Sequence, residues 1–440
     1  MSKAISWQQV QQYQQELQQQ PGHAALARAV QNVGIKAASR QQLGQAAFAP
    51  VFSDEIPTGV VTNQKHSGRC WMFAELNTMR HAVSGKFGVK NLEFSQAFLA
   101  FYDRLEKSNQ FLNQMIANVA APIGSRKLDW YLTWANGDGG QYENAASLIA
   151  KYGVIPKSVM PETYNSDNTT ELNATLNLKL RQDAVALRQA YASGATPDQL
   201  AAQRVQQLST IYRILAYAYG EPPRQFDFEY MDDQHQYHRV PGLTPRSFFD
   251  QFLGWDFDQY VMLISTNATG KEYWHSYTLP SQDHVEGGRR ILWVNVPEAV
   301  LEQAAIQQIQ GGETVWFGND VLADSDRQSG TLVGDLYAQS ELFGVDLHMD
   351  VGTRFDTHQA EVSHAMVLTG VDLVKGAPTK WKVENSWGSA NGHDGYFVAD
   401  ERWFQDYAYS VAINRQYLPQ RVLDVLDQAP TTLAPWDPLA

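Results

Sequence analysis

Apolar residues in the first half of the chain recur with the spacing of an α-helix. The clearest run follows Ser95, a residue type that caps helices, and places apolar side chains at Phe98, Leu99, Tyr102, Leu105, Phe111, Leu112 and Ile116. This spacing puts them on one face of a helix. Similar patterns predict helices over 70–84, 143–152, 172–193 and 197–220, and over 6–20 and 23–32 in a Gln-rich start.

The second half of the chain favours strands instead. Short apolar runs lie at 260–264, 291–294, 361–370, 381–384, 395–398 and 409–413. Runs of this length are typical of buried strands. The turn-like residues 375–378 separate two of them, which indicates a pair of adjacent strands. A helical half followed by a strand-rich half predicts an α+β fold.

The composition argues against several classes of protein, including nucleic-acid-binding, membrane-spanning and secreted proteins. A chain of 440 residues suggests two or three domains. Its net charge of −13 argues against nucleic acid as a main partner. The start lacks a signal-peptide core, and no apolar run approaches the length of a membrane span. With one cysteine and no option of an internal disulfide, the sequence predicts a cytoplasmic protein.

That single cysteine, Cys70, stands where a loop turns into a helix, directly after Ser67, Gly68 and Arg69. A helix N-terminus carries free N–H groups and a partial positive charge, which predict a shift toward the thiolate. A lone cysteine is more often a small buried hydrophobe. Gln64, six residues earlier, could donate to a developing oxyanion together with the Cys70 backbone N–H.

A cysteine nucleophile also needs a base and a group that orients the base. His364 lies in one predicted strand, and Asn385 ends the next one. Pairing of these strands brings the two side chains together, with the Asn oxygen accepting from the ring and Trp387 shielding that bond. Each residue alone has an ordinary structural explanation. The order Gln, Cys, His, Asn favours a cysteine hydrolase.

These motifs resemble the papain-like cysteine peptidases, in particular the aminopeptidase C and bleomycin hydrolase branch. The resemblance runs nearly end to end and is sharpest over 62–74, 138–141, 151–157, 363–370, 383–388 and 435–438. It implies a two-lobed papain-like fold with a large, mainly helical insertion.

The resemblance also implies a role for each matching residue. Cys70 matches the nucleophile, His364 the general base and acid, and Asn385 the residue that orients it. Gln64 matches the oxyanion donor. Gly139 and Gly140 match the glycines that lie along the substrate backbone, where a side chain would block the peptide.

The spacing of these residues predicts the domain organisation. Cys70 and His364 stand 294 positions apart, whereas compact papain relatives separate them by about 130–150 residues. We therefore expect an N-terminal helical extension (1–45), a helical lobe with the cysteine (46–165), an inserted helical subdomain (166–250), a β-rich lobe with the histidine and asparagine (251–422) and an extended C-terminal arm (423–440). In the resembled branch such insertions mediate assembly into a hexamer.

Other chemistries have weaker support in the sequence. The one close histidine pair, His235 and His238, is better explained as a solvated loop than as a metal site. Neither a serine-hydrolase elbow nor a phosphate-binding loop is found in the sequence. No metal or cofactor is therefore predicted, and peptides are the expected substrates. A peptide-binding scaffold without turnover is a weaker alternative.

The end of the chain bears on the kind of peptidase. In the resembled branch, the C-terminal arm lies in the cleft and its carboxylate binds the free amine of the substrate. The chain here runs only two residues past Pro438, to Ala440, about three fewer than in relatives of aminopeptidase type. Three residues of extended chain span roughly 10 Å. We expect an aminopeptidase or oligopeptidase, with Ala440 near the cleft, and keep an endopeptidase as the alternative.

Overall fold

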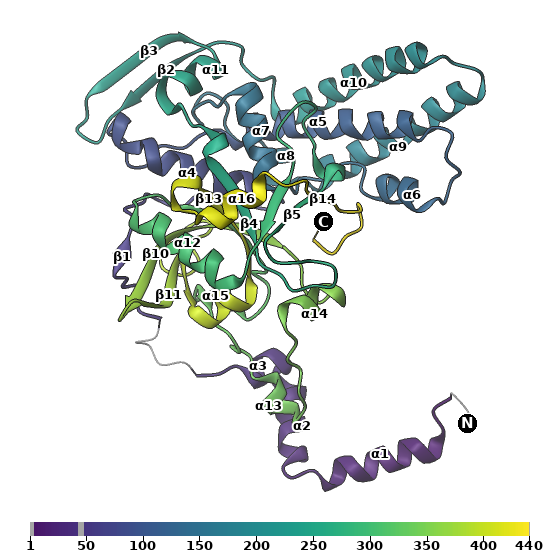
Figure 1. Cartoon of the computed structure of the whole chain (residues 1–440), viewed down its shortest axis with the longest axis vertical. Coiled ribbons are helices and arrows are strands. Elements are labelled where there is room, and N and C mark those ends of the chain that lie inside the picture. The colour runs from purple at the N-terminus through teal and green to yellow at the C-terminus, as the bar shows by residue number, and fades with distance from the viewer. Residues whose placement is uncertain (1–3, 43–47, 440) are drawn as a thin grey trace.

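The computed structural model describes residues 4–42 and 48–439 (Figure 1). Within these residues, twelve strands form one sheet. They are β1 (Asp54–Glu55), β4 (Tyr260–Ile264), β5 (His275–Thr278), β6 (Leu292–Asn295), β7 (Val315–Asn319), β8 (Ser325–Asp326), β9 (Thr331–Leu332), β10 (His364–Val374), β11 (Ala377–Glu384), β12 (Tyr396–Asp400), β13 (Ala408–Asn414) and β14 (Thr431–Thr432). Their order is β14-β5-β6-β4-β13-β7-β10-β11-β12-β9-β8, and β1 pairs with β10.

Helices cover both faces of this sheet. The helical lobe packs on one face and consists of α4 (Cys70–Phe87), α5 (Gln96–Ala117), α6 (Arg126–Thr133), α7 (Tyr142–Tyr152), α8 (Tyr164–Asp167), α9 (Thr170–Ala192), α10 (Pro197–Tyr219) and α11 (Pro245–Phe248). The other face carries α12 (Glu298–Gln310), α15 (Glu401–Tyr407) and α16 (Gln420–Leu426). Short π and 3₁₀ turns lie at Phe249–Leu253, Phe257–Gln259, Pro280–Gln282 and Arg415–Tyr417.

Strand β10 shows how one sheet serves two cores. Successive side chains of a strand point to opposite faces. Ala365 and Val367 accordingly join the core shared with the helical lobe, whereas Met366 and Leu368 join the core beneath α12, α15 and α16. A strand buried on both faces reads as a continuous apolar run, which is why its position was visible in the sequence.

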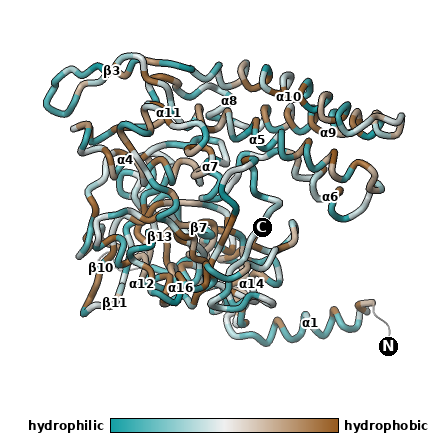
Figure 2. Tube along the Cα trace, turned by 45° about the horizontal axis from the view of Figure 1, so that its top comes forward, coloured by the Kyte–Doolittle hydropathy of each residue, from teal (hydrophilic) through white to brown (hydrophobic). Residues whose placement is uncertain are grey.

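The remaining helices lie at the edge of the molecule. They are α1 (Trp7–Gln19), α2 (His23–Val33), α3 (Ile35–Ser39), α13 (Gln339–Phe343) and α14 (Val351–Asp356). Ser6 and Gln9 form a capping box at the start of α1. Neither α1 nor α2 has a buried residue, and α1 projects away from the sheet as a largely hydrophilic helix (Figures 1 and 2). No helix in the described ranges is long and apolar enough to cross a membrane.

Two sequence expectations differ from the structure. Residues 166–250 were expected to be helical, but they include a hairpin of β2 (Phe226–Met231) and β3 (Tyr237–Leu243). Phe226, Phe228 and Tyr230 alternate along β2; Phe226 and Phe228 pack against Phe248, and Tyr230 packs against Phe87. This two-residue period covers only three residues and follows two long helices, so the sequence pattern did not reveal the hairpin.

The second difference concerns the C-terminal arm. Residues 423–440 were expected to be extended, but α16 continues to Leu426 because the residues before Pro430 are compatible with a helix. The extended part of the arm follows this helix and includes β14, which pairs in parallel with β5.

Candidate active site

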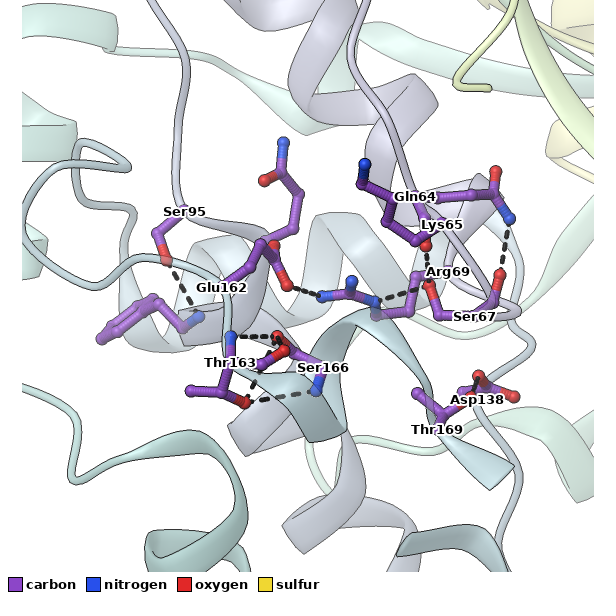
Figure 3. Close-up of polar contacts among 12 residues, drawn as sticks. Gln64, Lys65, Ser67, Arg69, Ser95, Asp138, Glu162, Thr163, Ser166 and Thr169 are labelled. Atoms are coloured by element: carbon purple, nitrogen blue, oxygen red, sulfur yellow. Dashed lines mark hydrogen bonds and ion pairs between the residues drawn. The ribbon is translucent and has the colours of Figure 1, made fainter. Parts of the chain in front are cut away.

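Cys70 is the first residue of α4, and the loop before it is held by buried polar contacts (Figure 3). The guanidinium of Arg69 is almost fully buried. It forms an ion pair with Glu162 at 2.9 Å, and its Nε donates to Ser67 Oγ at 3.0 Å. Ser67 in turn donates to the carbonyl of Gln64 at 2.7 Å. These contacts fix the path of the chain into the helix.

Asp138 connects this loop to Thr169, the residue before α9 (Figure 3). Its Oδ2 accepts from the Gly68 N–H and from Thr169 Oγ1, both at 2.6 Å. Its backbone carbonyl accepts from the indole N–H of Trp71 at 2.9 Å. A side chain at position 68 would meet the Asp138 carboxylate at 2.8 Å, so this approach requires glycine. Asp138 therefore sets the distance between the Cys70 loop and the two glycines that follow it.

Those glycines, Gly139 and Gly140, differ in their surroundings. A Cβ at Gly140 would lie 2.7 Å from the Trp71 ring, whereas a Cβ at Gly139 would meet nothing within 4 Å. The buried Lys107 ammonium accounts for part of the loop's position, because it donates to the carbonyls of Gly137 at 3.0 Å and Gly139 at 2.5 Å. The loop thus presents its glycines beside the start of α4.

His364 and Asn385 come from adjacent antiparallel strands. His364 is the first residue of β10, and Asn385 directly follows the last residue of β11. Their side chains meet at 2.9 Å between Nε2 and Oδ1, in a buried position. The Trp387 ring lies 4.9 Å from the imidazole. This hydrogen bond uses Nε2 of His364, so Nδ1 is the ring nitrogen that Asn385 leaves free of this contact.

Cys70 lies next to this pair. The backbone N–H of Ala365, the residue after His364, acts on its sulfur and lowers the thiol pKa, although burial has the larger, opposite effect. Packing of α4 against β10 brings the two together although they are far apart in sequence. In the same region, Trp316 Nε1 donates to the Trp71 carbonyl at 3.0 Å, which joins β7 to the first turn of α4.

Burial governs the charges at this site. It raises the pKa of the Cys70 thiol to about 11 and lowers the pKa of His364 to about 4. The expected shift of the thiol toward thiolate is therefore wrong for the cysteine taken alone, because desolvation outweighs the helix terminus. Transfer of the thiol proton to the imidazole creates both charges side by side, and their attraction offsets the cost of burying each.

Gln64 links the two halves of the site. Its Nε2 donates to the Ser67 carbonyl at 2.6 Å, and its Oε1 accepts from Ser386 Oγ at 2.6 Å. Ser386 follows Asn385, so this side chain connects the cysteine loop to the asparagine strand. An amide nitrogen has two hydrogens, and the bond to Ser67 uses one of them.

The C-terminal arm ends beside residues that neighbour the site in sequence. Lys271 forms an ion pair with Asp437 at 2.9 Å, and the Arg126 guanidinium lies 4.0 Å from the Trp436 ring. Leu439 is 7% exposed and lines a cavity with Gln141 and Val362. About 20 Å³ of that cavity is left open, roughly the space of one water. Ala440, expected near the cleft, lies outside the described residues.

Several contacts that shape the site were not foreseen from the sequence. Glu162, Thr169 and Lys107 come from separate elements and carry no motif, and only the position of Asp138 beside the glycine pair hinted at a role. Of the two candidate metal-site histidines, His238 pairs with Asp232 at 2.9 Å and stacks on Tyr230.

A separate acidic group lies away from these histidines. The carboxylates of Glu298, Glu302 and Glu401 come within 4.8 Å of one another. Burial and the neighbouring Glu302 raise the pKa of Glu401 to about 9. Burial therefore favours the protonated form of Glu401 beside the other two carboxyl groups.

Comparison with known proteins identifies the family. A model of the peptidase C1-like family matches residues 4–440. The chain belongs to this family. It is 44% identical to aminopeptidase G of Lactobacillus delbrueckii subsp. lactis over 440 residues and 43% identical to aminopeptidase E of Lactobacillus helveticus over 441 residues, with full coverage of both chains in each case.

A solved structure of the same family agrees in fold. The crystal structure of PepW from Lactobacillus rhamnosis HN001 superimposes with a TM-score of 0.98 at 46% identity, covering 100% of this chain and 99% of that one. The α+β, papain-like architecture expected from the sequence is thereby confirmed for this member of the peptidase C1-like family.

Proposed function

We propose that this peptidase is a cysteine aminopeptidase that removes residues from the free N-terminus of peptides. The observation that carries the proposal is the His364–Asn385 pair beside the Cys70 sulfur at the start of α4. The family match and the curated relatives, which are named aminopeptidases, support the same activity.

The proposed reaction proceeds through a thioester. His364 takes the thiol proton while the Cys70 sulfur attacks the peptide carbonyl carbon, forming the C–S bond. The Cys70 backbone N–H and the second N–H of Gln64 Nε2 stabilise the oxyanion. The C–N bond then breaks and His364 returns its proton to the leaving amine. Water, deprotonated by His364, attacks the thioester carbon; the C–S bond breaks, the acyl product leaves as an acid, and the proton on His364 returns to the Cys70 sulfur.

The arm supports removal of terminal residues. Leu439 lines the same small cavity as Gln141, which follows the glycine pair, and Val362, two residues before His364. An arm in this position blocks one end of the cleft, so the substrate's N-terminus lies at the cysteine. The same packing counts against the endopeptidase alternative, which needs both ends of the cleft open.

The test compares matched peptides with free and acetylated N-termini under reducing conditions, using wild type and Cys70→Ala. We expect stepwise cleavage of the free-amine peptides only, and no turnover by Cys70→Ala at unchanged thermal stability. Asn385→Ala should slow the reaction less than Cys70→Ala, because it removes only the group that orients His364. Efficient internal cleavage of acetylated peptides would establish endopeptidase action instead, and full activity of Cys70→Ala would contradict the assigned nucleophile.

The proposal includes a cytoplasmic, hexameric enzyme. One cysteine and no internal disulfide suit a reducing compartment. The projecting α1 exposes Trp7, Tyr13 and Leu17, at 70%, 53% and 57%, which suits contact with a second copy. Sedimentation of the full chain and of a form without residues 1–33 tests this: the full chain should sediment as a hexamer, and the shortened one as a smaller species.

A further inference from the structure

A second, larger cavity lies on the side of the molecule where α3 and α13 meet. It has a volume of about 1000 Å³ and lies between α3 and α13, α14, α15 and the loop that follows β7. Figure 1 shows α3 and α13 side by side beneath the sheet. Ligand pockets commonly have volumes of about 300–1000 Å³, so this one has room for several peptide residues.

Neighbouring residues separate this cavity from the one that holds Leu439. Phe355 and Val362 line the small cavity with Leu439. Arg354 and Glu361, one position earlier in each case, line the large one. The two cavities are therefore lined by neighbouring residues of the same two segments, and Leu439 of the arm lines the small one.

The lining of the large cavity comes close to His364 along the sheet. In the sheet, His364 pairs with Asn319, and the next residue, Asp320, lines the cavity. Asp320 also accepts a hydrogen bond at 3.0 Å from Ser363 Oγ, directly before His364. A peptide whose N-terminal side is stopped by the arm extends past His364, and this cavity is the space on that side.

Charge in the cavity is unevenly distributed. The basic side chains are engaged: Arg402 pairs with Asp335 at 2.6 Å, Arg354 with Asp406 at 4.0 Å, and Lys36 lies over the Tyr337 ring at 4.5 Å. In contrast, Asp320, Asp324 and Glu361 form no ion pair among the described residues. The cavity lining thus carries more carboxylates than cations, and three of these carboxylates lack a counter-ion among the described residues.

The cavity also offers an unused hydrogen-bond donor. Arg354 is 8% exposed, and its Nε has no partner among the residues that the structure describes. A buried N–H without a partner is costly, and a peptide carbonyl can accept from it. Donor and acids together fit a peptide with a positively charged side chain.

We propose that this cavity binds the part of the substrate on the carboxyl side of the cleaved bond and prefers a lysine or arginine there. The proposal rests on the aminopeptidase function proposed above, because it places the substrate's N-terminus at the arm. It assigns Glu361 and Asp324 to substrate selection and leaves the chemistry at Cys70 unchanged.

The test uses two tripeptide amides, Ala-Lys-Ala and Ala-Glu-Ala, and an alanyl aryl amide without residues beyond the cleaved bond. Wild type should cleave the lysine peptide with a kcat/KM about tenfold higher than the glutamate peptide. Glu361→Gln and Asp324→Asn should each reduce this ratio about threefold, and added salt should reduce it further. The control Glu221→Gln, an exposed residue just after α10, should leave the ratio unchanged.

The outcomes separate the two proposals. Cleavage of the aryl amide with equal rates for both tripeptides, or with the same ratio in wild type and both variants, would overturn the cavity assignment alone. Failure to cleave any substrate would overturn the aminopeptidase function. In that case calorimetric titration of Cys70→Ala with both tripeptide amides still tests the cavity. The proposal requires that Cys70→Ala binds the lysine peptide more tightly than the glutamate peptide. It also requires that this difference is lost when Glu361→Gln is added.

Discussion

The two sides of the active site are built in different ways. On one side, His364 and Asn385 are placed by the register of two neighbouring strands. On the other, Cys70 is placed by side-chain contacts that Asp138, Thr169 and Glu162 make with its loop. Backbone register is local and tolerant of side-chain changes, whereas the cysteine loop depends on single side chains. Substitutions should therefore affect activity more readily on the cysteine side.

Two buried glutamates extend this comparison. Glu384, on the strand side directly before Asn385, accepts from Arg80 at 2.7 Å and from His81 at 2.5 Å. Glu75, on the helix one turn after Cys70, has no hydrogen-bond partner for either oxygen within the described chain. Burial raises the pKa of Glu75 to about 8, whereas the charges of His81 and Arg80 lower the pKa of Glu384 despite its burial. Glu384 is therefore a charged residue held by two basic partners, whereas Glu75 is a buried carboxylic acid that favours its neutral form.

The largest expected effect comes from Glu384→Gln. Loss of one charge leaves Arg80 buried without its counter-ion, and breaking a buried ion pair costs about 3–5 kcal/mol. Urea denaturation near neutral pH measures this cost in the free energy of unfolding. The matched control is Glu55→Gln, whose exposed pair with Lys382 should contribute less than about 1 kcal/mol. Equal stability losses in the two variants would contradict the anchoring role.

A smaller effect is expected from Glu75→Gln, in the pH dependence of stability. Above the unfolded value of 4.5, the unfolded chain releases the proton that folded Glu75 keeps until about pH 8. The free energy of unfolding of wild type therefore falls as pH rises through this window. Between about pH 5 and 7 the contribution is about 3 kcal/mol. Glu75→Gln should remove it, and identical slopes in urea titrations of both proteins would show that Glu75 does not titrate in this way.

The substitution Asp138→Asn is expected to disturb the position of the cysteine loop and to leave the strand side unchanged. The substitution weakens the acceptor for Gly68 and Thr169, and misplacement of the nucleophile should lower kcat about 10- to 100-fold with a smaller change in KM. Thr169→Val, which removes only one of the two bonds, should cost less. Steady-state kinetics with the alanyl aryl amide gives both numbers. A change confined to KM would instead place Asp138 in substrate binding.

The smallest expected effect tests the link between the sides. Ser386→Ala removes the hydroxyl that donates to Gln64 Oε1 at 2.6 Å. A neutral hydrogen bond contributes about 1 kcal/mol, which corresponds to roughly a fivefold fall in kcat. If Ser386→Ala and Gln64→Ala act through the same contact, their effects should be less than additive in the double variant. Strict additivity would show that the two residues act separately.

This contrast also explains what the sequence could predict. His364 and Asn385 stand 21 residues apart across a tight hairpin, where Lys375 and Gly376 both have positive φ values of 55° and 84°. Such a local connection is readable from strand patterns and turn residues. The loop-to-helix pattern made Cys70 and Gln64 candidates, and the resemblance to a known family supplied the role of the glycine pair.

The contacts of the cysteine loop could not be predicted in the same way. Arg69 and Glu162 belong to segments separated by several helices, and no local pattern pairs them. The thiol pKa was misjudged for a related reason, because a helix start is visible in a sequence and the depth of its burial is not. The hairpin at 226–243 was missed because its alternating aromatic residues form a short signal.

The unequal surroundings of Gly139 and Gly140 constrain how this enzyme can diversify. The Trp71 ring leaves no space for a side chain at position 140. Substitutions there should therefore be removed by selection in any lineage that keeps the tryptophan. Position 139 has open space where a Cβ would stand. In a laboratory evolution experiment that selects for altered side-chain preference, tolerated variants should therefore accumulate at residue 139 while residue 140 stays glycine.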